Sequence, residues 1–352
     1  MANTTAYQCP ACTGPLHFDS ALGKLKCDYC DSVYEVSEVD QLYNDKVEEN
    51  LAAGKKWDED QISMYNCSTC GAEIICDKTT VATSCPYCGN PTVIPGQFKN
   101  SEMPDCIIPF KLDKTAAVQA LKKHYKGKIF LPEVFKEENH IEEIKGVYVP
   151  FWLFDGHCTA DITYTAQRIH VRRSGNQEIT RIDHYVIQRK AFVPYSLVPV
   201  DASKKMDNAE MDSIEPYDYR DLKPFTISYL PGYFAESYDE TVAECEARVK
   251  GRVETSAVDA ARSDVHGYTS LNTLHKNVNV KHSKIRYAFL PVWILNTKWK
   301  DKNFQFAMNG QTGKLVGNLP VDKGKFCKYF FSIAGIAAAV ISIAAYFLLT
   351  RM

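Results

Sequence analysis

The feature that most constrains this chain is a set of four Cys-x-x-Cys pairs within its first ninety residues. The pairs form two copies with identical spacing: residues 9–30 read CPACTGPLHFDSALGKLKCDYC, and residues 67–88 read CSTCGAEIICDKTTVATSCPYC. Zinc binds four thiolates in a tetrahedron, and each pair can present two sulfurs to one metal at about 2.3 Å. The fourteen residues between pairs are enough for a β-hairpin that brings the second pair back to the first. The sequence therefore predicts two small β zinc ribbons, over residues 1–36 and 65–95.

The predicted ligands fall into two sets of four. The first site takes Cys9, Cys12, Cys27 and Cys30, and the second takes Cys67, Cys70, Cys85 and Cys88. Four cysteines leave no open coordination position, so we expect two structural Zn²⁺ ions rather than catalytic ones. Glycine follows the second cysteine of each pair only in the second copy, as Gly71 and Gly89. Thr13 and Asp31 stand at these places in the first copy, so we expect the first site to bind metal more weakly.

Disulfides or redox-active pairs are the alternative interpretation of these cysteines. The duplicated spacing and a reducing compartment, argued below, both favour zinc. Five further cysteines stand outside the pairs, and we interpret them as small core residues: Cys76, Cys106, Cys158, Cys245 and Cys327.

The charge of the N-terminal part bears on what the ribbons bind. Residues 1–100 contain seven lysines, no arginine and fourteen acidic residues, a balance of −7. Each site with four thiolates and one Zn²⁺ adds a further −2, whereas binding to a phosphate backbone depends on clustered Lys and Arg. We therefore expect the ribbons to bind protein and not nucleic acid. The basic stretch at residues 168–181, RIHVRRSGNQEITR, keeps a nucleic-acid alternative open, although a solvated hairpin tip explains it more simply.

The C-terminal end carries an uncharged apolar run of twenty-two residues, 329–350, YFFSIAGIAAAVISIAAYFLLT. As a helix it would be about 33 Å long, enough to cross a hydrocarbon core of about 30 Å. Three lysines precede the run and one arginine follows it, which places the N-terminal side in the cytoplasm. We therefore expect a single-pass transmembrane tail anchor; a buried helix of a soluble protein is the alternative.

The region between the ribbons and the anchor has a mixed pattern. Residues 37–64 are acidic and helix-compatible and read as a linker, and residues 107–320 read as an α+β domain. Within this domain, VPFWLF around Pro150 matches LPVWIL around Pro291, and each follows a helix-like segment. We interpret this echo as a duplicated helix-plus-hairpin unit, with the prolines at strand starts.

The sequence favours a non-enzymatic protein. GxSxG, HExxH, Walker and GxGxxG motifs are all missing from it. Asp155, His157 and Cys158 stand close together, but neighbouring residues of a strand point to opposite faces, which would separate the imidazole from the thiol. A ligand-binding site within residues 107–320 remains an alternative.

Taken together, the chain resembles a bacterial family of membrane-anchored proteins with transcription-factor-IIB-type zinc ribbons, often labelled primosomal-helicase-like. The resemblance is carried by the paired cysteines, VYVPFWLFDG, VDASKKMDNAEMDSIEPYDYRDLKPF, YLPGYFAESYD and the terminal span. A helicase would need Walker motifs and hundreds more residues, so that label does not fit. The resemblance implies partnership with SPFH (flotillin-like) and phage-shock-protein-A-like proteins of membrane-stress systems.

These observations predict a tail-anchored adaptor in the bacterial cell membrane, with its ribbons in the cytoplasm. Ala334, Ala338 and Ser342 form a small-residue stripe in the predicted span, which would also permit helix–helix association in a homo-oligomer. The alternative is a membrane-tethered nucleic-acid-binding protein.

Overall fold

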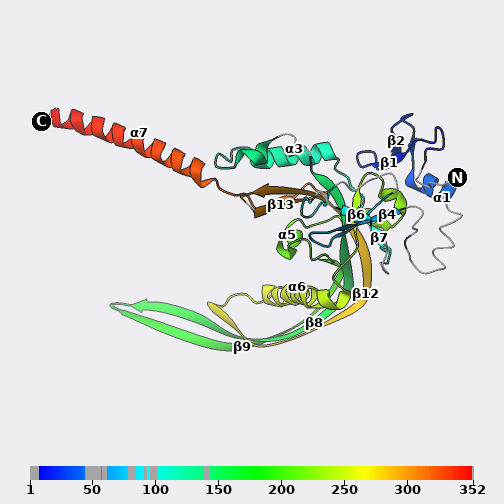
Figure 1. Ribbon diagram of the computed structural model, residues 1–352. Helices are drawn as coiled ribbons and strands as arrows, with labels where there is room; N and C mark the ends of the chain where they lie inside the picture. The colour runs from blue at the N-terminus through cyan, green and yellow to red at the C-terminus, as the bar shows by residue number, and fades with distance from the viewer. Residues whose placement is uncertain are drawn as a thin grey trace.

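We describe the fold from a computed structural model. It describes residues 8–43, 57, 62–77, 84–90, 93–95, 102–137, 141, 143–300 and 302–350. Most of the predicted linker, residues 44–56 and 58–61, lies outside this part. The expected broad architecture is confirmed: two four-cysteine clusters in small β regions, a mixed α+β domain and one long apolar C-terminal helix (Figure 1).

The two cysteine regions have different surroundings. The first forms a separate antiparallel sheet in the order β1-β2-β3, followed by a short helix. Its elements are β1 (Leu16–Asp19), β2 (Lys24–Cys27), β3 (Val33–Tyr34) and α1 (Val36–Tyr43). In the second, β4 (Ile62–Cys67) pairs with β5 (Glu73–Asp77) and β6 (Val93–Pro95), and these strands belong to the large sheet of the molecule.

Antiparallel strands, the first three of them long, build the α+β domain. They lie side by side in the order β9-β8-β12-β13-β14. Their bounds are β8 (Lys145–Ser174), β9 (Gln177–Asp201), β12 (Ser270–Trp299), β13 (Lys302–Asn309) and β14 (Leu315–Gly317). Three short strands join this sheet: β7 (Cys106–Ile107), β10 (Lys223–Pro224) and β11 (Phe234–Glu236).

The centre of the sheet is where the two matching sequence segments meet. Val149 and Leu290, which hold the same place in VPFWLF and LPVWIL, are paired directly across β8 and β12. The order of elements also repeats, as α3 (Lys114–Tyr125), β8, β9 and then α6 (Val242–Ser263), β12, β13. The two matching segments therefore run antiparallel beside each other and are related by an approximate two-fold axis. A duplicated unit would produce this arrangement.

The two prolines lie inside their strands, not at the strand starts as expected. Pro150 stands where β8 exchanges its neighbour β11 for β9, and Pro291 stands where β12 exchanges β7 for β13. The Pro150 carbonyl accepts from the Ala202 N–H, and the Pro291 carbonyl from the Gly310 N–H. In a strand the nitrogen and the carbonyl of one residue point to the same side. Each proline nitrogen therefore lies where its strand changes from one neighbouring strand to the next, and the missing N–H costs no hydrogen bond of the sheet.

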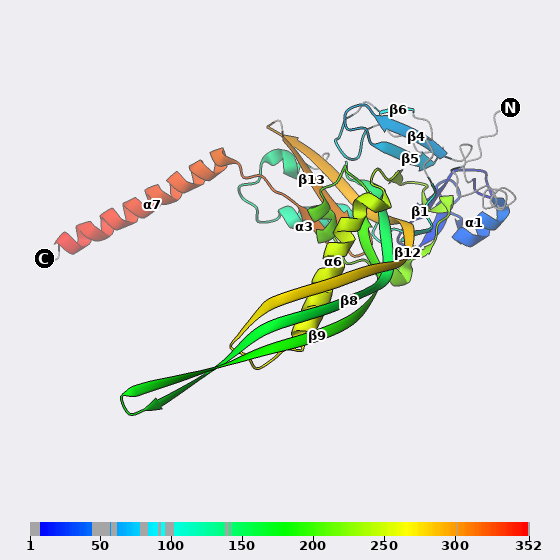
Figure 2. The ribbon, with the colours of Figure 1, turned by 90° about the horizontal axis from the view of Figure 1, so that it is seen from below.

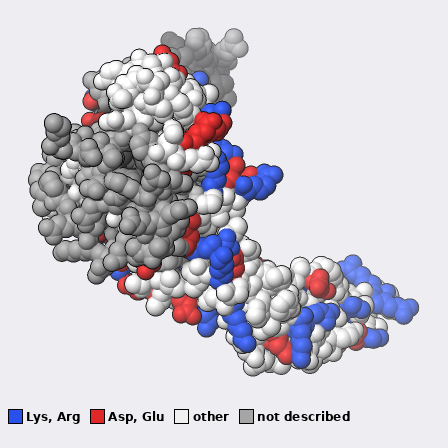
Figure 3. All heavy atoms as spheres, turned by 90° about the vertical axis from the view of Figure 1, so that its right-hand side faces the viewer, with Lys and Arg blue, Asp and Glu red and all other residues white. Residues whose placement is uncertain are grey.

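Beyond the body of the domain, β8, β9 and β12 continue as a long three-stranded arm (Figures 1 and 2). Helix α6 packs on one face of its base, and a capping box of Thr241 and Glu244 starts this helix. Lys and Arg side chains gather toward the end of the arm (Figure 3). The predicted basic stretch thus forms the hairpin between β8 and β9.

The remaining described elements are short, apart from the last. They are α5 (Asn208–Ser213) and three 3₁₀ turns, η2 (Glu133–Lys136), η3 (Tyr219–Asp221) and η4 (Ile227–Tyr229). Helix α7 (Lys323–Thr350) then projects away from the body on the same side as the arm (Figures 1 and 2). Its segment Lys323–Ile343 is long and apolar enough to cross a membrane, and its side chains are not buried against the rest of the chain.

Candidate metal centres

Four tight turns with one shared backbone pattern present the cysteines. In each turn the carbonyl of the first cysteine accepts the N–H of the residue just after the second cysteine. These donors are Thr13, Asp31, Gly71 and Gly89, at N···O distances of 2.8, 3.0, 2.9 and 3.0 Å. All four adopt positive φ angles, of 60°, 57°, 70° and 70° respectively. The non-glycine turns of the first ribbon therefore reach the same conformation as the glycine turns of the second.

The turns bring each predicted set of four sulfurs together. The Sγ–Sγ distance is 3.5 Å for Cys9–Cys30 and for Cys12–Cys27, and 3.6 Å for Cys67–Cys88 and for Cys70–Cys85. Within each set all four sulfurs lie within 4.8 Å of one another. A tetrahedron with metal–sulfur bonds of about 2.3 Å has edges of about 3.8 Å, whereas a disulfide bond is about 2.05 Å long. Both groups thus fit a thiolate-bound metal ion, with zinc the expected one.

The two centres differ in how far they are enclosed. In the first, Cys9 and Cys27 are buried but Cys12 and Cys30 are exposed. In the second, Cys67 and Cys85 are buried and the other two ligands are half-buried. Since the sulfur geometry is the same at both, weaker binding at the first site stays a prediction that rests on its exposure and on its non-glycine turns.

The second ribbon is continuous with the α+β domain. Its strand β5 pairs with β11, with Ile75 opposite Ala235. The Lys145 ammonium donates to the Ser84 carbonyl at 2.8 Å, and the Asn296 amide donates to the Pro86 carbonyl. These contacts hold the second pair of cysteines, because Ser84 and Pro86 flank Cys85.

The first ribbon also docks on this domain, through its hairpin and α1. The Phe18 N–H donates to the Pro231 carbonyl at 3.1 Å, and the Phe18 ring meets Tyr229 edge-on at 5.3 Å. The Ser228 hydroxyl donates to the Asp40 carboxylate of the α1 helix.

One segment, residues 227–237, therefore contacts both ribbons, and we call it the bridging segment. Its first half meets the first ribbon and its second half, β11, pairs with the second. Glu236 of this segment is only 1% exposed, and burial raises the pKa of its carboxyl to about 8. Sequence reasoning noted YLPGYFAESYD as distinctive but assigned it no role, because a contact between distant segments leaves no spacing signal.

Asp155, His157 and Cys158 do not converge on a common site. The Asp155 carboxylate accepts from Arg286 and, at 2.8 Å, from the Leu197 N–H, at a bulge where the arm bends away from the body. His157 stacks on Phe192, whereas Cys158 is fully buried. Of the other cysteines outside the clusters, Cys76, Cys106 and Cys245 are buried and Cys327 is exposed on α7.

Comparison with known proteins gives an extensive match. The chain is 34% identical over 330 residues to the protein named "Uncharacterized protein YdjG" of Bacillus subtilis (strain 168), with 94% of each chain covered. No protein-family model and no solved structure matches the chain.

Proposed function

The chain belongs to the family of Bacillus subtilis YdjG, and from that premise we propose that it is a non-enzymatic, tail-anchored membrane adaptor. In this proposal the two zinc ribbons and the α+β domain bind cytoplasmic proteins, and α7 tethers the assembly to the cell membrane. One observation carries the proposal. Two groups of four cysteines are attached to the α+β domain, and this domain is followed by an exposed apolar helix.

The chemistry of the centres supports a structural role. Four thiolates saturate a zinc ion, so the ion would hold the ribbon's shape and offer no open position to a substrate. The backbone turns preorganise the four sulfurs of each site. In every Cys-x-x-Cys pair the carbonyl of the first cysteine accepts a backbone hydrogen bond that fixes the turn.

The surface of the first ribbon supports protein recognition. Tyr29, between the ligands Cys27 and Cys30, is 77% exposed, and Leu22 at the hairpin tip is 54% exposed. Large apolar side chains in an otherwise acidic region suit a protein partner better than a phosphate backbone. The family resemblance in the sequence makes SPFH (flotillin-like) or phage-shock-protein-A-like proteins the partners that we propose.

Affinity purification of the tagged full chain from membranes in mild detergent tests the proposal. We expect an SPFH or phage-shock-protein-A-like protein to co-purify and to be lost from the Leu22→Ser/Tyr29→Ser variant, which keeps every zinc ligand. Cys67→Ser/Cys70→Ser should also reduce recovery, whereas Cys327→Ser, outside both clusters, should not. Failure to recover such a protein, or equal recovery with the Leu22/Tyr29 variant, would contradict the proposal.

The alternative, a membrane-tethered nucleic-acid binder, would depend on the end of the arm (Figure 3). Three of its arginines already have partners: Arg173 pairs with Glu178, Arg181 pairs with Asp183, and Arg168 lies over the Tyr185 and Tyr268 rings. This reduces the positive charge available to phosphates. Salt-sensitive retention of DNA or RNA by the full chain, abolished by Arg172→Gln/Arg173→Gln, would favour the alternative.

A further inference from the structure

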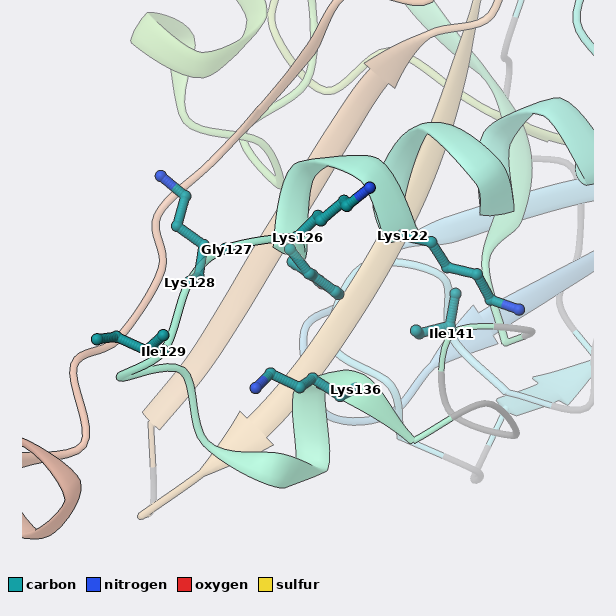
Figure 4. A pocket seen from close by; sticks show the side chains of 8 residues that line it. Lys122, Lys126, Gly127, Lys128, Ile129, Lys136 and Ile141 are labelled. Carbon is teal, nitrogen blue, oxygen red and sulfur yellow. The ribbon is translucent and has the colours of Figure 1, made fainter.

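A hollow of about 520 Å³ lies between the C-terminal end of α3 and η2 (Figure 4). Four lysines are among its described lining residues, and none of these described residues is acidic. The described lining residues are Lys122, Tyr125, Lys126, Gly127, Lys128, Ile129, Lys136 and Ile141. The hollow therefore combines a concentrated positive charge with some apolar wall.

Helix electrostatics explains only part of this charge. Lysines in the last turn of a helix favour its negative C-terminal end, which accounts for Lys122. Lys128 follows the helix by a turn that Gly127 makes with φ +79°, and Lys136 comes from η2. Figure 4 shows the four lysine side chains around the hollow, with their ammonium nitrogens pointing in different directions. Lys136 has the Glu133 carboxylate at 3.9 Å, which offsets part of this charge, and the remaining excess of positive charge favours an anion.

The hollow lies at the root of the apolar helix. The Asp322 N–H donates to the Phe130 carbonyl at 2.8 Å, and the Lys325 ammonium donates to the Leu131 carbonyl at 2.9 Å. The Phe130 ring meets Phe326 and Tyr329 of α7 edge-on, at 5.4 and 5.9 Å. The loop that lines the hollow is therefore fixed to the first turns of α7.

These aromatic and basic residues match the composition of a membrane–water interface. Aromatic rings concentrate at the level of the lipid headgroups, and lysine clusters beside a membrane span attract anionic lipids. Lys323 and Lys328 add positive charge at the start of α7, where Lys325 pairs with Glu133. Ile129, half-exposed on the same loop, offers apolar surface next to the lysines.

We propose that this hollow binds the phosphate-bearing headgroup of an anionic membrane lipid. The flexible lysine side chains would turn their ammonium groups toward the phosphate, and Ile129 and Phe130 would lie at the level where the acyl chains begin. The inference rests on the anchoring part of the proposed function but not on the adaptor role. It adds recognition of lipid type to the tether that α7 alone would provide.

Native mass spectrometry of the full chain in a neutral detergent, titrated with phosphatidylglycerol or phosphatidylcholine, tests the proposal. We expect preferential binding of phosphatidylglycerol. Lys126→Gln/Lys128→Gln/Lys136→Gln should weaken it by about fivefold per lysine, on the order of a hundredfold in total. The matched control, Lys250→Gln/Lys281→Gln/Lys284→Gln, changes the net charge equally on α6 and the arm and should leave the affinity within about twofold.

Three results would overturn the proposal: equal affinity for the two lipids, unchanged phosphatidylglycerol binding by the hollow variant, or displacement of the lipid by inorganic phosphate alone. The last result would assign the hollow to a soluble phosphate compound. Insertion of the same proteins into phosphatidylcholine nanodiscs reports anchoring separately. A chain that inserts but shows no lipid preference contradicts this inference alone, whereas failure to insert contradicts the anchor.

Discussion

At the scale of single residues, the first metal centre adopts a backbone conformation that its side chains disfavour. Left-handed φ angles cost a residue with a Cβ roughly 1–2 kcal/mol, and β-branched threonine is among the least tolerant. Local contacts offset part of this cost: the Thr13 hydroxyl donates to the Cys12 carbonyl at 2.6 Å, and Asp31 pairs with Lys26 at 3.0 Å. Metal binding at the first site must therefore offset a conformational cost that glycine removes from the second.

Thr13→Gly should strengthen the first site by about 1 kcal/mol, because glycine adopts φ 60° without a steric penalty. Gly71→Ala should weaken the second site by a similar amount. Its φ is +70° and nothing lies within 4 Å of a new Cβ, so the backbone alone would be strained. Zinc release to a chromogenic chelator measures both effects. Faster release from Thr13→Gly than from the unchanged chain would contradict the prediction.

Glu236 should make the fold sensitive to pH. Its carboxyl has a pKa of about 8 in the folded chain, against an ordinary value of 4.5, and it lies near Tyr87, Ser203, Lys205 and Asp239. The folded chain then retains a proton that the unfolded chain releases. Stability should therefore fall by up to about 1.4 kcal/mol per pH unit as the pH rises from 4.5 to 8, and change little above that.

Glu236→Gln should remove this dependence, because the amide resembles the protonated carboxyl at every pH. We expect the variant to melt above the unchanged chain at about pH 8 and near it at about pH 5, as followed by differential scanning fluorimetry. Parallel losses of melting temperature with rising pH in both proteins would show that another group is responsible.

Residue-scale prediction from sequence was strong for the cysteines and weak for their surroundings. The clustering of eight cysteines into two groups of four follows from spacing alone, because two residues between cysteines fix a tight turn, and their role as ligands stays a prediction. The positive φ of Thr13 and Asp31 was not expected, since their identities favour other conformations. The burial of Glu236 could not be expected either, because it arises from distant segments that meet in the fold.

At the scale of elements, α6 holds the base of the arm by packing on the sheet and by ion pairs. Its buried residues repeat every four positions, giving one apolar stripe against the sheet: Cys245, Val249, Val253, Ala257 and Ala261. Two arginines secure it to the end of β9 and the chain that follows. Arg248 pairs with the fully buried Asp201 at 2.6 Å, and Arg252 pairs with Glu215 at 2.6 Å. Burial raises the pKa of Asp201 to about 6 even though Arg248 opposes the shift.

Arg248→Met should destabilise the domain by about 3–5 kcal/mol, since it leaves a buried carboxylate without its partner. The double variant Asp201→Asn/Arg248→Met should recover much of that loss by removing the isolated charge. Thermal unfolding in detergent, followed by circular dichroism, compares the two. A double variant that is no more stable than the single variant would contradict this account of the pair.

The sequence pattern predicted strands in this region but not their length. VYVPFWLF and ADITYTAQRIHV are two separate strand-like runs in the sequence, with Asp155-Gly156 in the stretch between them. The structure makes them one strand, β8, and places a bulge at the junction. Gly156 is needed there because a Cβ would lie 2.1 Å from the Lys281 carbonyl oxygen. Sequence alone does not distinguish a glycine that ends a strand from one that bends it.

At the scale of the whole molecule, the second ribbon and the α+β domain share one sheet through β5 and β11. The sequence suggested separate modules, and the boundaries at residues 65–95 and 107–320 stay a prediction. A shared sheet implies that the metal of the second ribbon supports the domain as well as the ribbon.

Removal of zinc should therefore lower the melting temperature of the entire part of the chain that precedes α7. We expect about two zinc ions per chain by elemental analysis. We also expect a chelator to shift the main unfolding transition, with recovery on re-addition of zinc. Cys67→Ser/Cys70→Ser should reproduce most of this shift, and Cys9→Ser/Cys12→Ser less of it. An unchanged main transition after chelation would instead show that the ribbons are independent modules.

The pairing of Val149 with Leu290 also determines the order in which this chain can fold. The two residues are 141 positions apart, so the central sheet forms only after a very long loop has closed. Non-local strand pairing is slow and leaves strand edges exposed while it proceeds. The ribbons and the β8–β9 hairpin, by contrast, close over short distances and can form during synthesis. Because β12 is made long after β8, the domain must remain soluble without its central strand pair until β12 has emerged.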